Sequence, residues 1–65
     1  MEKRIKYRGC VIITDNYLNY ENSFFWAVER HGVEIENTLR TDDKMWTNHE
    51  SAQESAKRYI DSILD

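Results

Sequence analysis

The stretch "SFFWAVERHGVEIE", residues 23–36, decides the fold because two apolar runs lie on either side of His31 and Gly32. Glycine adopts a positive φ at little cost, so these two positions predict a two-residue loop between antiparallel strands. A longer turn is the alternative, since histidine is not the usual partner of glycine in such a loop. The cross-strand partners are then Arg30 with Val33, Val28 with Ile35, Trp26 with Asn37 and Phe24 with Leu39. This stretch therefore predicts a β-hairpin.

The hairpin register separates apolar from polar side chains, as a correct register should. One face is predicted to carry Phe24, Trp26, Val28, Val33, Ile35 and Leu39. The opposite face is predicted to carry Phe25, Ala27, Glu29, Glu34, Glu36 and Thr38. The first face is expected to pack into the core and to leave Phe25 on the open side of the sheet.

Upstream of this hairpin, alternation predicts one long half-buried strand over residues 4–14. Its apolar positions are Ile5, Tyr7, Val11 and Ile13, which alternate with Arg4, Lys6, Arg8 and Cys10. Gly9 is interpreted as a bulge or a close helix contact. The segment from 15 to 23 is rich in Asn and Asp and is predicted to be a loop.

Downstream, Thr47 and Glu50 form the S/T-x-x-E pattern of a capping box and predict the start of a helix. Its apolar face is predicted to consist of Ala52, Ala56, Tyr59, Ile60, Ile63 and Leu64. The whole chain, 1–65, is thus expected to be a single α+β domain. It would have a three-stranded antiparallel sheet with one C-terminal amphipathic helix packed on one face.

The composition indicates an acidic, non-membrane chain. Of 65 residues, nine are Lys or Arg and twelve are Asp or Glu. Residues 1–8 hold four cations and one acid, a net charge of +3, so the rest of the chain carries −6. An acidic surface disfavours general nucleic-acid binding and favours a basic protein partner. The single cysteine, Cys10, and the absence of an apolar leader predict a reducing, cytoplasmic location.

Catalytic and metal-binding chemistry finds little support in these residues. The histidines His31 and His49, together with Cys10, cannot supply four zinc ligands. The carboxylate pairs Asp42/Asp43 and Glu34/Glu36 would need a cleft for acid–base work, which a domain of this size scarcely encloses. We therefore expect no enzyme activity, no metal and no cofactor.

Three functional interpretations remain. The first is a protein-binding module whose partner is a host protein complex, with a surface composed of Phe25, Glu34, Glu36, Asp42, Asp43, Met45, Trp46, Tyr17 and Tyr20. The second is a nucleic-acid-binding domain that uses Arg4, Lys6, Arg8, Phe25, Arg40 and Lys44. The third is a homodimer formed through a sheet edge or the helix. For each surface residue the alternative is a solvated face, and for Trp46 it is packing at the helix entrance.

Over most of its length the chain resembles small phage and prophage proteins with a "YRG…I…W…G…A…ID" pattern. The matching residues are Tyr7, Arg8, Gly9, Ile12, Trp26, Gly32, Ala52, Ala56, Ile60 and Asp61. This resemblance implies the architecture and a mobile-element origin, but no function. An inhibitor of the anti-CRISPR or host-takeover type is expected by analogy with other proteins of this size and source. Tyr7, Arg8 and Gly9 also resemble the start of integrase arm-binding and plant ethylene-response-factor domains, which read DNA with a three-stranded sheet.

Overall fold

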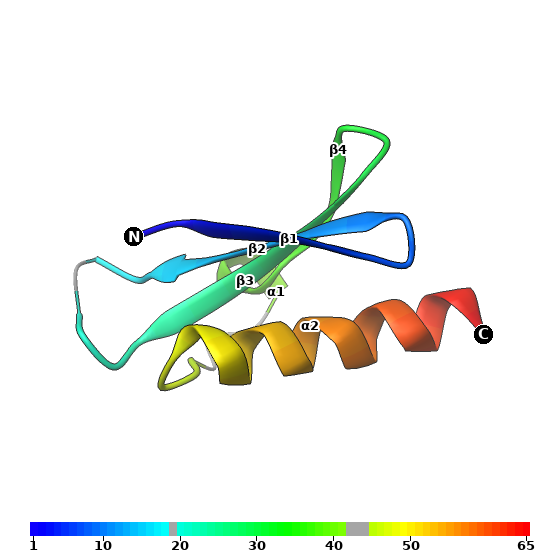
Figure 1. Ribbon diagram of the computed structural model, residues 1–65. Coiled ribbons are helices and arrows are strands. Elements are labelled where there is room, and N and C mark those ends of the chain that lie inside the picture. Colours follow the sequence, from blue (N-terminus) through cyan, green and yellow to red (C-terminus); the bar gives the residue numbers. More distant parts are fainter. Residues whose placement is uncertain (19, 42–44) are drawn as a thin grey trace.

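The computed structural model describes residues 1–18, 20–41 and 45–65, and within them a sheet of four antiparallel strands with a long C-terminal helix (Figure 1). The elements are β1 (Lys3–Tyr7), β2 (Cys10–Asn16), β3 (Phe24–Arg30), β4 (Val33–Asn37), α1 (Thr38–Thr41) and α2 (His49–Leu64). The strands lie in chain order, β1-β2-β3-β4, and α2 runs across one face. The α+β class with a C-terminal helix is confirmed. The sheet has four strands instead of the predicted three.

The additional strand arises because the predicted strand over residues 4–14 is a hairpin. Arg8 and Gly9 have φ values of 51° and 80°, so the chain reverses there and Tyr7 pairs with Cys10. Two residues at positive φ are the geometry of a tight hairpin turn. The reversal also changes which side chains share a face, because directly paired residues point to the same side. Cys10 therefore lies on the face of Tyr7, contrary to the alternation expected along one strand.

The second hairpin follows the prediction only near its turn. His31 and Gly32 have φ values of 54° and 78°, and Arg30 pairs with Val33 as expected. Between Val28 and Glu29 the register shifts, so that Val28 pairs with Glu36 instead of Ile35. Such a bulge bends the strand that carries the additional residue. Accordingly, β4 rises away from α2 in Figure 1.

This bend overturns part of the predicted core. Val33, Ile35 and Leu39 were expected beneath the helix, yet their exposed fractions are 62%, 38% and 43%. The shift also pairs Asn37 with Ala27 instead of Trp26. Glu36, expected on the open face, pairs directly with Val28 and so lies on the face that α2 covers.

Beyond the end of β4, Thr38 and Trp46 form hydrogen bonds with the outer edge of β3. The Thr38 hydroxyl donates to the carbonyl oxygen of Trp26 at 3.1 Å and accepts from the Trp26 amide at 3.2 Å. Farther along, Trp46 and Phe24 exchange backbone hydrogen bonds of 2.8 and 3.0 Å. Trp46 thus takes the place predicted for Leu39, and Thr38 is buried at this edge instead of facing solvent.

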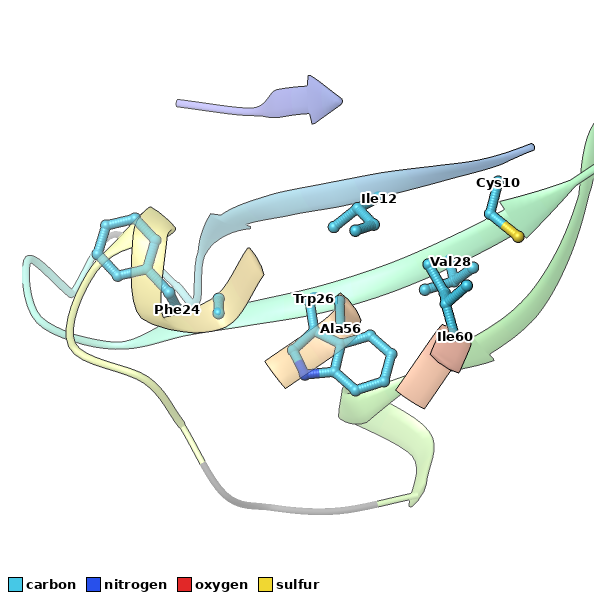
Figure 2. Packing of buried hydrophobic residues seen from close by; sticks show 8 residues of the cluster. Cys10, Ile12, Phe24, Trp26, Val28, Ala56 and Ile60 are labelled. Atoms are coloured by element: carbon cyan, nitrogen blue, oxygen red, sulfur yellow. The ribbon is translucent and has the colours of Figure 1, made fainter. Parts of the chain in front are cut away.

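The core lies between the sheet and α2, where side chains from β2, β3 and the helix meet (Figure 2). Its buried members are Cys10, Ile12, Phe24, Trp26, Val28, Ala52, Ala56 and Ile60. The predicted helix face is confirmed at Ala52, Ala56 and Ile60, whereas Ile63 is 43% exposed.

The helix cap is displaced by one residue from the predicted capping box. Asn48, instead of Thr47, is the N-cap, and its Oδ1 accepts from the Ser51 amide at 2.8 Å. Asparagine is among the strongest N-cap residues because its side chain satisfies an amide that the first helical turn leaves unpaired. Asn48 therefore starts α2 at His49.

Candidate protein-binding surface

The face of the sheet opposite α2 is the open face of the described chain, since α1 lies at the outer edge of β3. Direct cross-strand pairing places side chains of one row on the same side. One row contains Lys6, Val11, Glu29 and Glu34, and the next contains Arg4, Ile13, Ala27 and Asn37. A third row contains Asp15 and Phe25. These ten residues are called the open face below.

The centre of the open face is apolar. Ile13 and Ala27 form a direct cross-strand pair and are only 8% and 3% exposed, although α2 lies on the other side of the sheet. Val11 and Phe25 beside them are partly exposed. Long Lys and Arg stems on a sheet can cover apolar neighbours while their charged ends stay in water. The open face therefore has a buried apolar floor with Val11 and Phe25 at its surface.

Charged side chains frame this apolar centre in pairs of opposite sign. Arg4 binds Glu2 through Nε at 2.8 Å and approaches Glu29 through Nη1 at 3.5 Å. The hydrogen bond with Glu2 is the main cause that raises the pKa of Arg4 above its usual value. Glu34 forms an ion pair with Arg40. The directly paired Glu29 and Glu34 thus each have an arginine nearby, which offsets their mutual repulsion.

Arg8 lies away from the open face, although it was grouped with Arg4 and Lys6 from the sequence. From the turn between β1 and β2 it reaches the end of α2, where it binds Asp61 at 2.8 Å and Asp65 at 3.1 Å. The Tyr7 hydroxyl donates to Asp61 at 2.9 Å. These hydrogen bonds hold the pKa of Asp61 below its usual value and raise the pKa of Tyr7. We call these four residues the hairpin clasp.

A surface hollow lies beside the clasp and is lined by residues 6–11. Arg8 is one of these lining residues, and its guanidinium group is already bound to two carboxylates. The one arginine among the residues that line the hollow is therefore already engaged.

The structure brings together only part of the predicted protein-binding set. Phe25 and Glu34 share the open face, whereas Glu36 points to the other side of the sheet. Tyr17 is partly buried, and Tyr20 is 60% exposed in the connection between β2 and β3. Asp42, Asp43 and Lys44 lie outside the described residues. Arg40 is exposed and reaches back to Glu34.

Met45 and Trp46 are both partly buried at the helix entrance. The Trp46 ring lies 6.2 Å from the ring of Trp26, and the backbone of Trp46 bridges to Phe24. These contacts confirm the packing interpretation of Trp46. Trp26 is buried, and the centroid of its ring lies 5.5 Å from that of the Tyr59 ring. The Trp26 Nε1 has no hydrogen-bond partner among the described residues.

The remaining candidates for chemistry occupy structural positions. His49 opens α2, and its Nδ1 lies 2.7 Å from the Thr14 hydroxyl oxygen, while burial lowers the pKa of its ring. Cys10 is a buried free thiol in the core. Within residues 1–18, 20–41 and 45–65, no three His, Cys, Asp or Glu side chains form a group that could hold a metal ion.

Sequence reasoning missed Val11 and Ile13 as residues of the open face. It assigned them to the apolar face of one long strand, because alternation continues unbroken through the turn. The available signal was the Arg8-Gly9 dipeptide, which resembles the His31-Gly32 dipeptide that was correctly interpreted as a hairpin loop.

Comparison with protein-family models, with curated proteins and with solved structures finds no match for this chain. Among the described residues, neither helix is long and apolar enough to cross a membrane.

Proposed function

We propose that this chain is a non-catalytic protein-binding module whose interaction surface is the open face of the sheet. The observation that carries the proposal is the arrangement of this face. Val11 and Phe25 lie partly exposed over the buried Ile13–Ala27 pair, and charged side chains surround them. An apolar centre with a polar rim is typical of protein–protein interfaces. Phe25 would be the anchor, since buried aromatic residues contribute most of the binding energy in such interfaces.

A protein ligand fits this surface better than a nucleic acid does. Of the four described cations in the alternative set, Arg4, Arg8 and Arg40 are each paired with carboxylates. Phosphate binding would have to break these pairs, and Glu29 and Glu34 would repel the backbone of the nucleic acid. Lys6 is the cation of that set with no ion pair among the described residues.

The partner we propose is a host protein complex that the module occupies and thereby inhibits or redirects. This part of the proposal rests on the resemblance to small phage proteins and on the acidic composition of the chain. Acidic side chains at a rim accelerate association with a basic partner and select against acidic ones.

The proposal is tested by affinity capture from a cell lysate with the tagged chain, with and without nuclease, followed by mass spectrometry. The decisive variant is Phe25→Ser, which removes the anchor from the open face. The matched control is Ile63→Ser, which removes an exposed apolar side chain from α2. Circular dichroism establishes that both variants remain folded.

We expect one protein partner that survives nuclease, is retained by the Ile63→Ser variant and is lost by the Phe25→Ser variant. A partner that both variants retain would show that the open face is not the binding surface. If every captured protein disappears after nuclease, the nucleic-acid interpretation replaces this proposal. Salt-dependent binding of a labelled duplex would then fall when Lys6 is replaced by alanine.

A further inference from the structure

The two edge strands of the sheet carry opposite charges. β1 contributes Lys3, Arg4 and Lys6, whereas β4 contributes Glu34 and Glu36. Among the described strands, each of these two has a neighbour on one side only. An edge strand offers backbone donors and acceptors to another strand, and like charges that face each other across two strands repel. Two β1 edges or two β4 edges are therefore kept apart, whereas a β1 edge attracts a β4 edge.

The two edges also match in length and direction. β1 and β4 are each five residues long, and every strand in the sheet is antiparallel to its neighbour. β4 therefore runs antiparallel to β1. A second copy placed beside the first in the same orientation presents its own β1 antiparallel to β4. Placing Lys6 opposite Glu34 then also places Tyr7 opposite Val33, and both of these lie on the face that α2 covers.

The side chains needed for such pairing are accessible. Val33 and Ile35 are 62% and 38% exposed on β4, so pairing would remove apolar surface from water. Lys6 is exposed and has no ion-pair partner among the described residues. Glu34 already binds Arg40, but a carboxylate has about four acceptor positions and can bind a second cation. Lys6 and Glu34 both belong to the open face, so they would meet on the same side of the joined sheet.

We propose that copies of this chain associate through their unlike edges, β1 of one copy pairing antiparallel with β4 of the next. The ion pair between Lys6 and Glu34 selects this pairing over contacts between like edges. Because the contact is heterologous, each pair of copies keeps one free edge of each kind, and the assembly closes into a ring or continues as a series. The centre of the open face remains uncovered, so this proposal stands or falls separately from the proposed function.

Two five-residue edges form a contact smaller than a standard interface. We expect a dissociation constant on the order of 0.1–1 mM, in the range of weak and transient contacts. The experiment is sedimentation velocity of the untagged chain from micromolar to millimolar concentrations, at low and at high salt. The test variants are Lys6→Glu and Glu34→Lys, each examined alone and in an equimolar mixture.

The mixture provides the sharpest test. The native β4 edge of the Lys6→Glu variant can meet the native β1 edge of the Glu34→Lys variant, and the two substituted edges are complementary to each other. We expect each variant alone to associate at least about tenfold more weakly than the natural chain and the mixture to recover association. High salt should weaken association of the natural chain, because the charges at the edges are exposed.

Matched controls carry the same charge changes away from both edges. Arg58→Glu lies on the exposed side of α2, and Glu21→Lys lies in the connection between β2 and β3. We expect both controls to sediment like the natural chain. A natural chain that stays monomeric at millimolar concentration would overturn the proposal. So would an equimolar mixture that associates no better than its components, as a contact between open faces would give. A single variant that associates as strongly as the natural chain would also overturn it, because a contact between like edges leaves one of the two variants unaffected.

Discussion

The molecule contains two hairpins that have nearly identical turns but differ in strand register and in packing. Arg8-Gly9 and His31-Gly32 both place a non-glycine residue near φ 50° and a glycine near φ 80°. The first hairpin pairs without a register shift, and Arg8 ties its turn to the end of α2. The second hairpin contains a bulge and leaves Val33 and Ile35 exposed on β4.

The difference shows that the geometry of a turn determines that a hairpin forms, but not whether the hairpin packs against the helix. The clasp at Asp61 and the apolar side chains of β1 and β2 hold the first hairpin against the helix. The additional residue in β4 bends the second hairpin away from it. Packing and register, more than turn geometry, therefore distinguish the anchored hairpin from the projecting one.

The largest expected difference between the two hairpins lies in matched isoleucine truncations. Ile12 in β2 is fully buried, so Ile12→Ala should lower the free energy of unfolding by about 2–5 kcal/mol. Ile35→Ala in β4 should cost only about 0.5 kcal/mol, since little packing is lost at an exposed position. Urea unfolding followed by tryptophan fluorescence measures both. Equal losses would show that β4 packs as tightly as β2.

The two turns themselves should respond alike. A Cβ added at Gly9 or Gly32 meets no atom within 4 Å, so the cost of Gly→Ala comes from the positive φ alone. We expect each substitution to lower the free energy of unfolding by about 1–2 kcal/mol. The same urea experiment measures this. A difference larger than 1 kcal/mol between the two would mean that the turns are not equivalent.

Asparagine should separate the two turns, because its short polar side chain can hydrogen-bond locally and so lets it visit the left-handed region. His31→Asn should raise the free energy of unfolding by roughly 0.5 kcal/mol. Arg8→Asn relieves the same backbone strain but removes the contacts with Asp61 and Asp65, so we expect a lower thermal midpoint. Thermal unfolding by circular dichroism measures both variants, and a stabilising Arg8→Asn would show that the contacts of Arg8 with Asp61 and Asp65 contribute less than the backbone strain costs.

The smallest effect is a pH dependence specific to the first hairpin. Arg8 and Tyr7 hold the pKa of Asp61 below its ordinary value of 3.8, so this carboxylate stabilises the fold above that pH. As the pH falls below 3.8 through the lowered pKa, protonation of Asp61 removes the contribution. The gap in urea midpoint between the natural chain and the Asp61→Asn variant should therefore narrow from pH 5 to pH 2. A gap that stays constant would contradict this role of the carboxylate.

Local patterns predicted the fold where one signal dominated. Gly32 between two apolar runs predicted the second hairpin, and the spacing of Ala52, Ala56 and Ile60 predicted the buried face of α2. The alternation of apolar and polar residues gave no sign of the first turn. Tyr7 and Val11 lie on either side of that turn and are both apolar, so the pattern is the same for one continuous strand and for a hairpin. The bulge at β4 left no local signal, since it depends on how the sheet twists against the helix.

Residues of the candidate site were predicted correctly where their position depends on neighbours in the sequence, and incorrectly where it depends on distant contacts. Phe25 and Glu34 were assigned correctly to the open face because they lie close to the turn or on the well-predicted strand β3. Glu36 changed sides because a shift of one residue reverses every side chain beyond it. The destination of Arg8 could not be predicted, since its partners Asp61 and Asp65 are more than fifty residues away.

The strand order of the sheet has a consequence for the speed of folding. Each strand pairs with the next strand in the chain, so the sheet forms by closing short loops. Short loops cost little chain entropy, and proteins rich in local contacts fold fastest. The clasp between the first turn and the end of α2 joins the most distant segments. We expect the sheet to collapse early and the clasp to close last, which makes the clasp a determinant of the unfolding rate more than of the folding rate.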